Sequence, residues 1–236
     1  MSIDIGFIVT AFFEILAALP LTLVITIVPL LFGFVIGVAA ALIRMYKVKV
    51  LHRIADAYVS FLRGTPVILH VFLIYWGLPM LIDKLSMHYG WGIKTASIPI
   101  LSFVLTAFSL TAGAYMSEII RSGLLAVNRG QIEAAYSVGM STPQALRRIV
   151  LPQAIGVILP NLCNLFVGFL HTSTFAFTFS QMELLGKASV VASNNLKFLE
   201  AFIAAALIYW GITVVAERLT AYLEKRVTKY NRGGVT

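Results

Sequence analysis

The chain has 236 residues, of which 59% are hydrophobic and only 12% are charged. Soluble globular domains carry about 25% charged residues, so this composition excludes a soluble domain and predicts an integral membrane protein. The formal net charge of +8 does not indicate nucleic-acid binding, because the basic residues lie in short loops beside apolar segments. The single cysteine, Cys163, excludes an intramolecular disulfide bond.

The first apolar segment, residues 5–19, is short for a membrane span, contains Glu14 and stops at Pro20. A segment of this kind lies at the membrane surface or packs against a helical bundle. We therefore expect residues 1–19 to form an interfacial helix ahead of the membrane-spanning core.

Five further segments are apolar and long enough to cross a bilayer, which takes about 20 helical residues. They cover residues 21–43, 64–82, 98–120, 154–177 and 198–216. The sequence thus predicts an all-α integral membrane protein that forms a single domain, with a five-span core over residues 20–220. Pro160 is expected to break the fourth span. Residues 83–96 are predicted to form an outer loop, residues 180–197 a polar outer segment, and residues 221–236 a cytoplasmic tail.

Lysine and arginine are distributed unevenly between the two sides of this scheme. Fourteen fall on one side and four on the other, the four being Lys84, Lys94, Lys187 and Lys197. Cytoplasmic loops are enriched in these residues. The imbalance predicts a multi-pass protein of the cell membrane with its N-terminus outside and its C-terminus in the cytoplasm.

A polar, arginine-rich stretch, residues 121–153, separates the third and fourth spans. Gly139 allows a bend, and Ser141 followed by Gln144 predicts a capping box at the start of a helix over residues 142–150. Pro152 is expected to end or kink that helix. The stretch is either an ordinary surface loop or a surface presented to a soluble partner.

The spacing within this stretch resembles a known signature. Glu133-Ala134-Ala135, three residues, Gly139, nine residues and Ile149-x-Leu151-Pro152 match the EAA signature of membrane-spanning subunits of ATP-binding cassette importers. Arg63-Gly64-Thr65-Pro66 and Leu151-Pro152-Gln153-Ala154 are similar to runs in the branch that imports polar amino acids. The resemblance covers roughly residues 10 to 220. It implies the type I importer transmembrane fold and a coupling loop that docks into a separate ATPase subunit.

The resemblance also implies the partners. Such a subunit pairs with a second permease subunit, as a homodimer or heterodimer, and receives its substrate from an extracytoplasmic amino-acid-binding protein. Two partner ATPase subunits bind the ATP and Mg²⁺. This chain has no Gly-x-x-x-x-Gly-Lys phosphate loop and no metal-ligand spacing among its four histidines, so we expect a transport subunit that is not an enzyme and binds no cofactor.

The predicted fourth span carries a polar stripe. At 100° per residue, Asn161, Asn164, Gly168, His171 and Thr172 fall on one face. Amides and an imidazole at membrane depth must face protein or water, so the stripe either lines the substrate path or hydrogen-bonds between subunits.

Many relatives have a Lys-Asp-Thr-Ser run where this chain reads His171-Thr172-Ser173-Thr174. Both fixed charges of that run are therefore absent. Their absence favours a dipolar or bulky polar amino acid, such as cystine, over a strongly cationic one.

Three further positions have two interpretations each. Ser109 belongs to a face of small residues on the third span that either packs against another helix or lines the path. His70 either faces the path or is a packing residue. Glu118 pairs locally with Arg121 or reaches Arg63 on the second span.

Two other classes of protein compete with the importer subunit. An ion-gradient-driven secondary transporter would need an ionisable relay inside the membrane. A non-transporting membrane anchor would not need an inward polar stripe.

Overall fold

The computed structural model describes residues 3–92 and 94–228, and these residues are almost entirely helical, with no strand among them. The first five helices are α1 (Ile5–Leu16), α2 (Leu19–Met45), α3 (Leu51–Gly64), α4 (Val67–Tyr89) and α5 (Ile100–Leu125). The others are α6 (Arg129–Ser137), α7 (Thr142–Ala145), α8 (Leu151–Thr172), α9 (Leu184–Asn195) and α10 (Phe198–Thr228).

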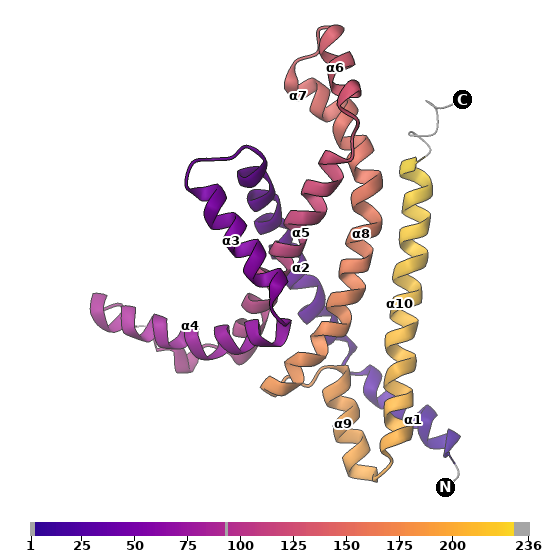
Figure 1. Cartoon of the computed structure of the whole chain (residues 1–236). Helices are drawn as coiled ribbons and strands as arrows, with labels where there is room; N and C mark the ends of the chain where they lie inside the picture. The colour runs from indigo at the N-terminus through magenta and orange to yellow at the C-terminus, as the bar shows by residue number, and fades with distance from the viewer. Residues whose placement is uncertain (1–2, 93, 229–236) are drawn as a thin grey trace.

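Five helical stretches are long and apolar enough to cross a membrane, which confirms the predicted number of spans for the described residues. They are α2, α4, α5, the stretch Thr142–Phe179 that contains α8, and most of α10. In Figure 1, α2, α5, α8 and α10 run beside one another, and α4 diverges from them. Helices α6 and α7 and the C-terminal end of α10 lie at one end of this bundle, and α1 and α9 lie at the other.

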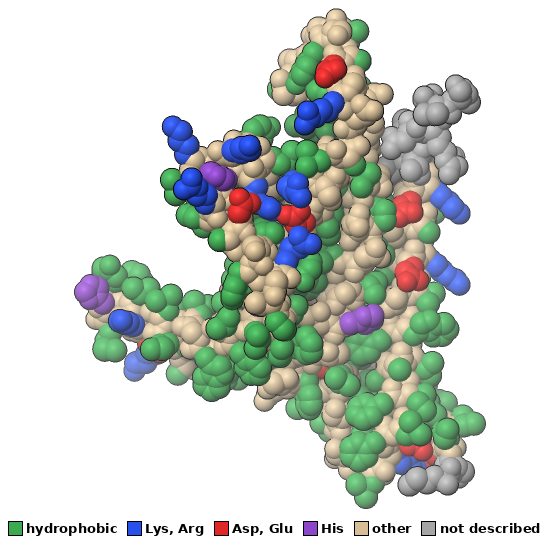
Figure 2. Space-filling view, viewed as in Figure 1, with side chains coloured by type: hydrophobic (Ala, Val, Ile, Leu, Met, Phe, Trp, Pro, Cys, Tyr) green, Lys and Arg blue, Asp and Glu red, His purple; other side chains and the backbone are tan. Residues whose placement is uncertain are grey.

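Basic and hydrophobic side chains gather over different helices. Figure 2 shows basic side chains over α3 and near α6 and α7, whereas hydrophobic side chains cover much of α4, α9 and the adjoining part of α10.

Helices α2 and α5 form the closest helix pair, because Gly33 and Gly37 lie one turn apart on the contacting face of α2. A Cβ atom on Gly33 would lie 2.5 Å from the Cβ of Ala112, and one on Gly37 would lie 2.6 Å from the Cβ of Met116. Small residues spaced in this way let two helix backbones approach inside a membrane. The part of the small-residue face of α5 that contains Gly113 and the buried Ser117 therefore packs against α2.

Helix α1 packs against α9 and α10, the second of the two alternatives for residues 1–19. Two ion pairs join the same elements: Lys187 Nζ lies 3.0 Å from Glu14 Oε1, and Lys197 Nζ lies 2.6 Å from Asp4 Oδ2. Pro20 does not end this helix. It stands in the first turn of α2, where a proline costs no helical hydrogen bond.

The prediction that Pro160 breaks the fourth span is wrong, and Pro152 does not end the helix before it. The chain stays helical from Thr142 to Thr172, because a π-helical turn, Leu146–Val150, joins α7 to α8. Pro152 lies in the first turn of α8 and does not stop the helix. Pro160 lies inside α8, which continues through it; a proline removes one helical hydrogen bond and the remaining turns hold the helix.

Three other element boundaries also differ from the sequence prediction. Helix α4 continues to Tyr89, and Asp83, expected in a loop, accepts hydrogen bonds from the backbone N–H and hydroxyl of Thr95. The predicted polar outer segment contains α9, and α10 extends through residue 228 into the predicted tail. The second half of that tail, residues 229–236, lies outside the described residues.

The glycine contact predicts opposite effects for two alanine substitutions. Gly33→Ala overfills the α2–α5 contact, and we expect it to lower the free energy of unfolding by about 1–3 kcal/mol. Gly211→Ala on α10 meets no atom within 4 Å, so its better helix propensity should raise that free energy by up to about 1 kcal/mol. Thermal unfolding of the purified protein in detergent measures both. Equal unfolding temperatures for the two variants would contradict the close α2–α5 approach.

Candidate coupling loop and translocation path

The first half of the 121–153 stretch is a short helix with defined ends. Asn128 caps α6 by accepting a hydrogen bond from the backbone N–H of Gly130 at 2.9 Å. At the other end Gly139 has a φ of +80°, the left-handed region that favours glycine. Its N–H donates to the carbonyl of Tyr136, and the N–H of Met140 donates to the carbonyl of Ala135, the pattern of a Schellman cap. The bend therefore depends on glycine at position 139.

The second half begins with α7. The side chain of Gln144 accepts a hydrogen bond from the N–H of Ser141 at 2.9 Å, as expected for a capping box. A shallow recess follows, lined by Pro143, Gln144, Arg147 and Arg148. The loop thus presents two guanidinium groups beside an open hollow.

The residues of the EAA signature divide into an exposed and an interior set. Glu133, Ala134, Gly139 and Leu151 are exposed, and Ile149 and Pro152 are half-buried. Ala135 is buried, and Val150 packs with Val127 and Ala154 at the base of the loop. Val150, the unspecified position between Ile149 and Leu151, thus packs the base of the loop, and the exposed signature residues remain available for contact with another protein.

The polar stripe of α8 is open to the surroundings of the single chain. Asn161, Asn164 and His171 are exposed, and Thr172 is half-buried. Asn161 donates to the carbonyl of Val157 at 2.8 Å, so its amide is partly satisfied by its own helix. Because α8 has the composition of a membrane span, this face must be covered by protein or water.

His70 and Ser109 lie elsewhere. His70 is 2% exposed, and its two ring nitrogens lie 2.7 Å from the hydroxyl of Thr65 and 2.9 Å from that of Thr111. Ser109 is 8% exposed and donates to the carbonyl of Leu105 at 2.6 Å. Both side chains are partnered inside the chain, and the structure does not bring them onto the exposed stripe of α8.

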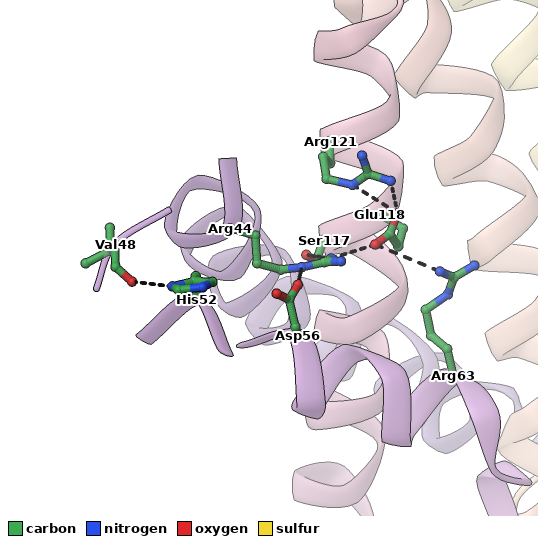
Figure 3. Close-up of polar contacts among 8 residues, drawn as sticks. All are labelled: Arg44, Val48, His52, Asp56, Arg63, Ser117, Glu118 and Arg121. Atoms are coloured by element: carbon green, nitrogen blue, oxygen red, sulfur yellow. Dashed lines mark hydrogen bonds and ion pairs between the residues drawn. The ribbon is translucent and has the colours of Figure 1, made fainter. Parts of the chain in front are cut away.

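Glu118 is the centre of an ion cluster near the end of the bundle that carries the coupling loop (Figure 3). Its carboxylate lies 2.5 Å from Arg44 Nη1, 2.8 Å from Arg121 Nη2 and 4.0 Å from Arg63 Nη1. Arg44 also binds Asp56 at 2.6 Å. Both partners considered for Glu118 are thus present, and the cluster ties α2, α3 and α5 together.

Arg44 and Asp56 were not anticipated as members of this cluster. In the sequence, Arg44 belongs to a basic run that the enrichment of lysine and arginine in cytoplasmic loops already explains. The available signal was Asp56, an isolated acid within the basic approach to the second span. A second tie lies nearby: Tyr58 on α3 donates to the carbonyl of Leu110 at 2.5 Å, and burial raises the pKa of this phenol to about 12.

Comparison with known proteins places these features in a family. The family model "Binding-protein-dependent transport system inner membrane component" matches residues 33–229, most of the chain. The chain belongs to this family. Members are transport components of ATP-binding cassette importers, in which a separate subunit carries the ATPase activity.

Individual relatives match over nearly the whole length. The chain is 38% identical over 228 residues to the probable amino-acid permease protein YxeN of Bacillus subtilis, covering 97% of both chains. It is 37% identical to the L-cystine transport system permease protein TcyL of the same organism, covering 90% of this chain and 87% of the relative. A crystal structure of an amino acid ABC transporter with histidines matches with a TM-score of 0.80 at 31% identity, covering 96% of this chain and 100% of that one. These matches agree with the all-α importer fold expected from the resemblance.

The ion cluster predicts a stability difference between two identical substitutions. Glu118→Gln removes the charge that three arginines share at a partly buried site, and we expect a loss of about 1.5–3 kcal/mol in the free energy of unfolding. Glu14→Gln, which breaks the more exposed pair with Lys187, should cost about 0–1 kcal/mol. Chemical denaturation of the purified permease measures both. A loss for Glu118→Gln no larger than that for Glu14→Gln would show that the cluster does not hold the three helices together.

Proposed function

We propose that this permease is the membrane-spanning subunit of an ATP-driven importer for polar amino acids. The observation that carries the proposal is the loop between α5 and α8. It is built as a helix, a glycine bend and a second helix, and it keeps Glu133 and Ala134 exposed. The second helix continues without a break into α8, which bears the polar stripe. A partner that moves the loop would therefore also move a wall of the candidate path.

The partners follow from the family and from the exposed surfaces. Two ATPase subunits, which bind the ATP and Mg²⁺, dock at the coupling loops of two permease subunits. A second permease subunit, identical or similar, faces the stripe of α8 and closes the path between the two chains. An extracytoplasmic binding protein delivers the amino acid to the opposite end, near α9.

The substrate class follows from the stripe. Asn161, Asn164, His171 and Thr172 supply neutral hydrogen-bonding groups at membrane depth and no fixed charge. The relative TcyL is named an L-cystine transport system permease protein, and a stripe without fixed charges suits a dipolar amino acid of this kind. We therefore assign a neutral polar amino acid, with cystine as the first to test.

The competing transporter class is not favoured. A proton or ion relay would need a series of ionisable groups along the path. Glu118 is held in the ion cluster and His70 by two hydroxyl groups, so His171 is the one ionisable side chain on the described stripe of α8.

Uptake by the reconstituted complex tests the proposal. Proteoliposomes that contain the permease pair, the ATPase and the binding protein are supplied with radiolabelled L-cystine or L-glutamine. They should transport these amino acids only when Mg-ATP is present on the side of the membrane to which the ATPase is bound. Gly139→Val should abolish this uptake and the co-purification of the ATPase, because a β-branched residue resists a φ of +80°. Glu133→Lys should give the same result by reversing a charge on the docking face.

The matched control is Gly139→Asn, since asparagine tolerates the left-handed region. It should retain most of the ATPase binding and uptake. Uptake driven by an ion gradient without ATP would overturn the proposed function, and full coupling by Gly139→Val would overturn the role of the loop.

The orientation is part of the proposal and is tested separately. In a Cys163→Ala background, single cysteines at Ser97 and Asn194 should react with an impermeant maleimide on intact cells. A cysteine at Ser141 should react only after the cells are opened. All three native positions are exposed in the structure. The reverse labelling pattern would place the N-terminus in the cytoplasm.

A further inference from the structure

Glu183 is a completely buried acid that the coupling loop, the stripe and the ion cluster do not use. Its side chain is 0% exposed. Its Oε1 accepts the N–H of Gly186 at 2.8 Å and its Oε2 accepts the N–H of Leu185 at 3.0 Å, so it caps α9. The hydroxyl of Thr22 accepts the N–H of Leu184 at 3.0 Å. Three N–H groups at the start of α9 are therefore satisfied.

Capping alone does not account for a glutamate at this position. Serine, threonine, aspartate and asparagine are the preferred N-cap residues, and each has a shorter side chain. The additional reach of Glu183 is used by a third donor: the hydroxyl of Tyr209 on α10 donates to Oε2 at 2.8 Å. Burial raises the pKa of Glu183, and the hydrogen bonds oppose this shift. All three donors point at carboxylate oxygens, the arrangement that suits the ionised form.

The phenol of Tyr209 connects this buried site to the path. With its hydroxyl anchored on Glu183, the ring has one preferred orientation. The ring pairs with the imidazole of His171, with ring centroids 6.3 Å apart and planes at 68°, an edge-to-face geometry that aromatic pairs favour. His171 is itself exposed on the stripe of α8. The sequence from buried acid to phenol to imidazole therefore ends at the candidate substrate surface.

We propose that Glu183 and Tyr209 are positioning residues that hold the His171 imidazole in the orientation that contacts a neutral polar amino acid in the path. This inference rests on the proposed function. His171 supplies the contact, Tyr209 limits its ring to one orientation, and Glu183 fixes Tyr209. The three residues come from α8, α10 and the turn before α9, so the orientation of His171 also depends on how these segments pack.

The test measures binding to the path without the binding protein. The assembled permease–ATPase complex in nanodiscs is titrated with radiolabelled L-cystine and, in parallel, L-glutamine, and Kd is referred to the amount of assembled complex. Tyr209→Phe keeps the ring but loses the hydroxyl. Glu183→Asp keeps a preferred cap for α9 and the charge, but it is one methylene shorter and releases Tyr209. Tyr222→Phe, an exposed tyrosine farther along α10, is the control.

We expect Tyr209→Phe and Glu183→Asp each to raise Kd about fivefold or more, and Tyr222→Phe to leave it unchanged. His171→Leu should raise Kd at least as much. Because Tyr209 acts through His171, the double variant Tyr209→Phe/His171→Leu should bind no more weakly than His171→Leu alone, a non-additivity typical of residues in contact.

Each other outcome counts against the inference. An unchanged Kd with a lower unfolding temperature would give Glu183 and Tyr209 a purely structural role. A double variant whose loss is the product of the two single losses would show that Tyr209 does not act through His171. If the wild-type complex neither binds these amino acids nor imports them with ATP, the proposed function fails and the inference with it. Normal wild-type binding with unaffected variants removes only the inference.

Discussion

The close contact between α2 and α5 determines where the other elements lie. Gly33 and Gly37 present no side chain towards α5, so Ala112, Met116 and the backbone of α5 lie directly against the backbone of α2. Without a hydrophobic driving force between helices in lipid, such close packing is what favours association. The contact also brings Arg44, at the end of α2, within reach of Glu118 on α5. Helix α3 then adds Asp56 and Arg63 to the same cluster. The glycine contact thus brings α2 and α5 together, and the ion pairs align α2, α3 and α5 at the end of the bundle that carries the coupling loop.

One continuous helix joins the loop between α5 and α8 to the polar stripe of the candidate path. The chain is helical from Thr142 through the π turn to Thr172, which at 1.5 Å per residue is a length of about 45 Å. His171 therefore lies on the same continuous helix as Pro143, Gln144, Arg147 and Arg148, which line the recess of the loop. Under the proposed function, a tilt of α7 on a docked ATPase would be passed along this continuous helix to the polar stripe, and ATP can favour one state only through different contacts in the two states.

The sequence was informative where a feature depends on local chemistry. Span number follows from apolar length, and the bend at Gly139 follows from the conformational freedom of glycine. The prolines were misleading as signals of helix ends. Pro160 lies inside α8, where one helical hydrogen bond is missing and the other turns keep the helix, and Pro152 lies in its first turn, directly after the π turn. Helix α9 was missed because its apolar face is short and it is held by distant residues, Thr22 and the N-cap Glu183. The members of the ion cluster lie up to 77 positions apart, and only the fold brings them together.

The exposed faces of the single chain explain why a second subunit is part of the proposed function. Its core is built around α5, whereas the membrane-crossing window of α4 and that of the stretch containing α8 are each only 11% buried. For α4 the exposed side chains are mostly apolar, and lipid can cover them. For α8 they include Asn164 and His171, and lipid cannot satisfy an amide and an imidazole. A facing subunit or a water-filled path must therefore cover this side. In the proposed dimer both are present, because each chain would supply one polar wall of the path, with Tyr209 and Glu183 behind the His171 of that wall.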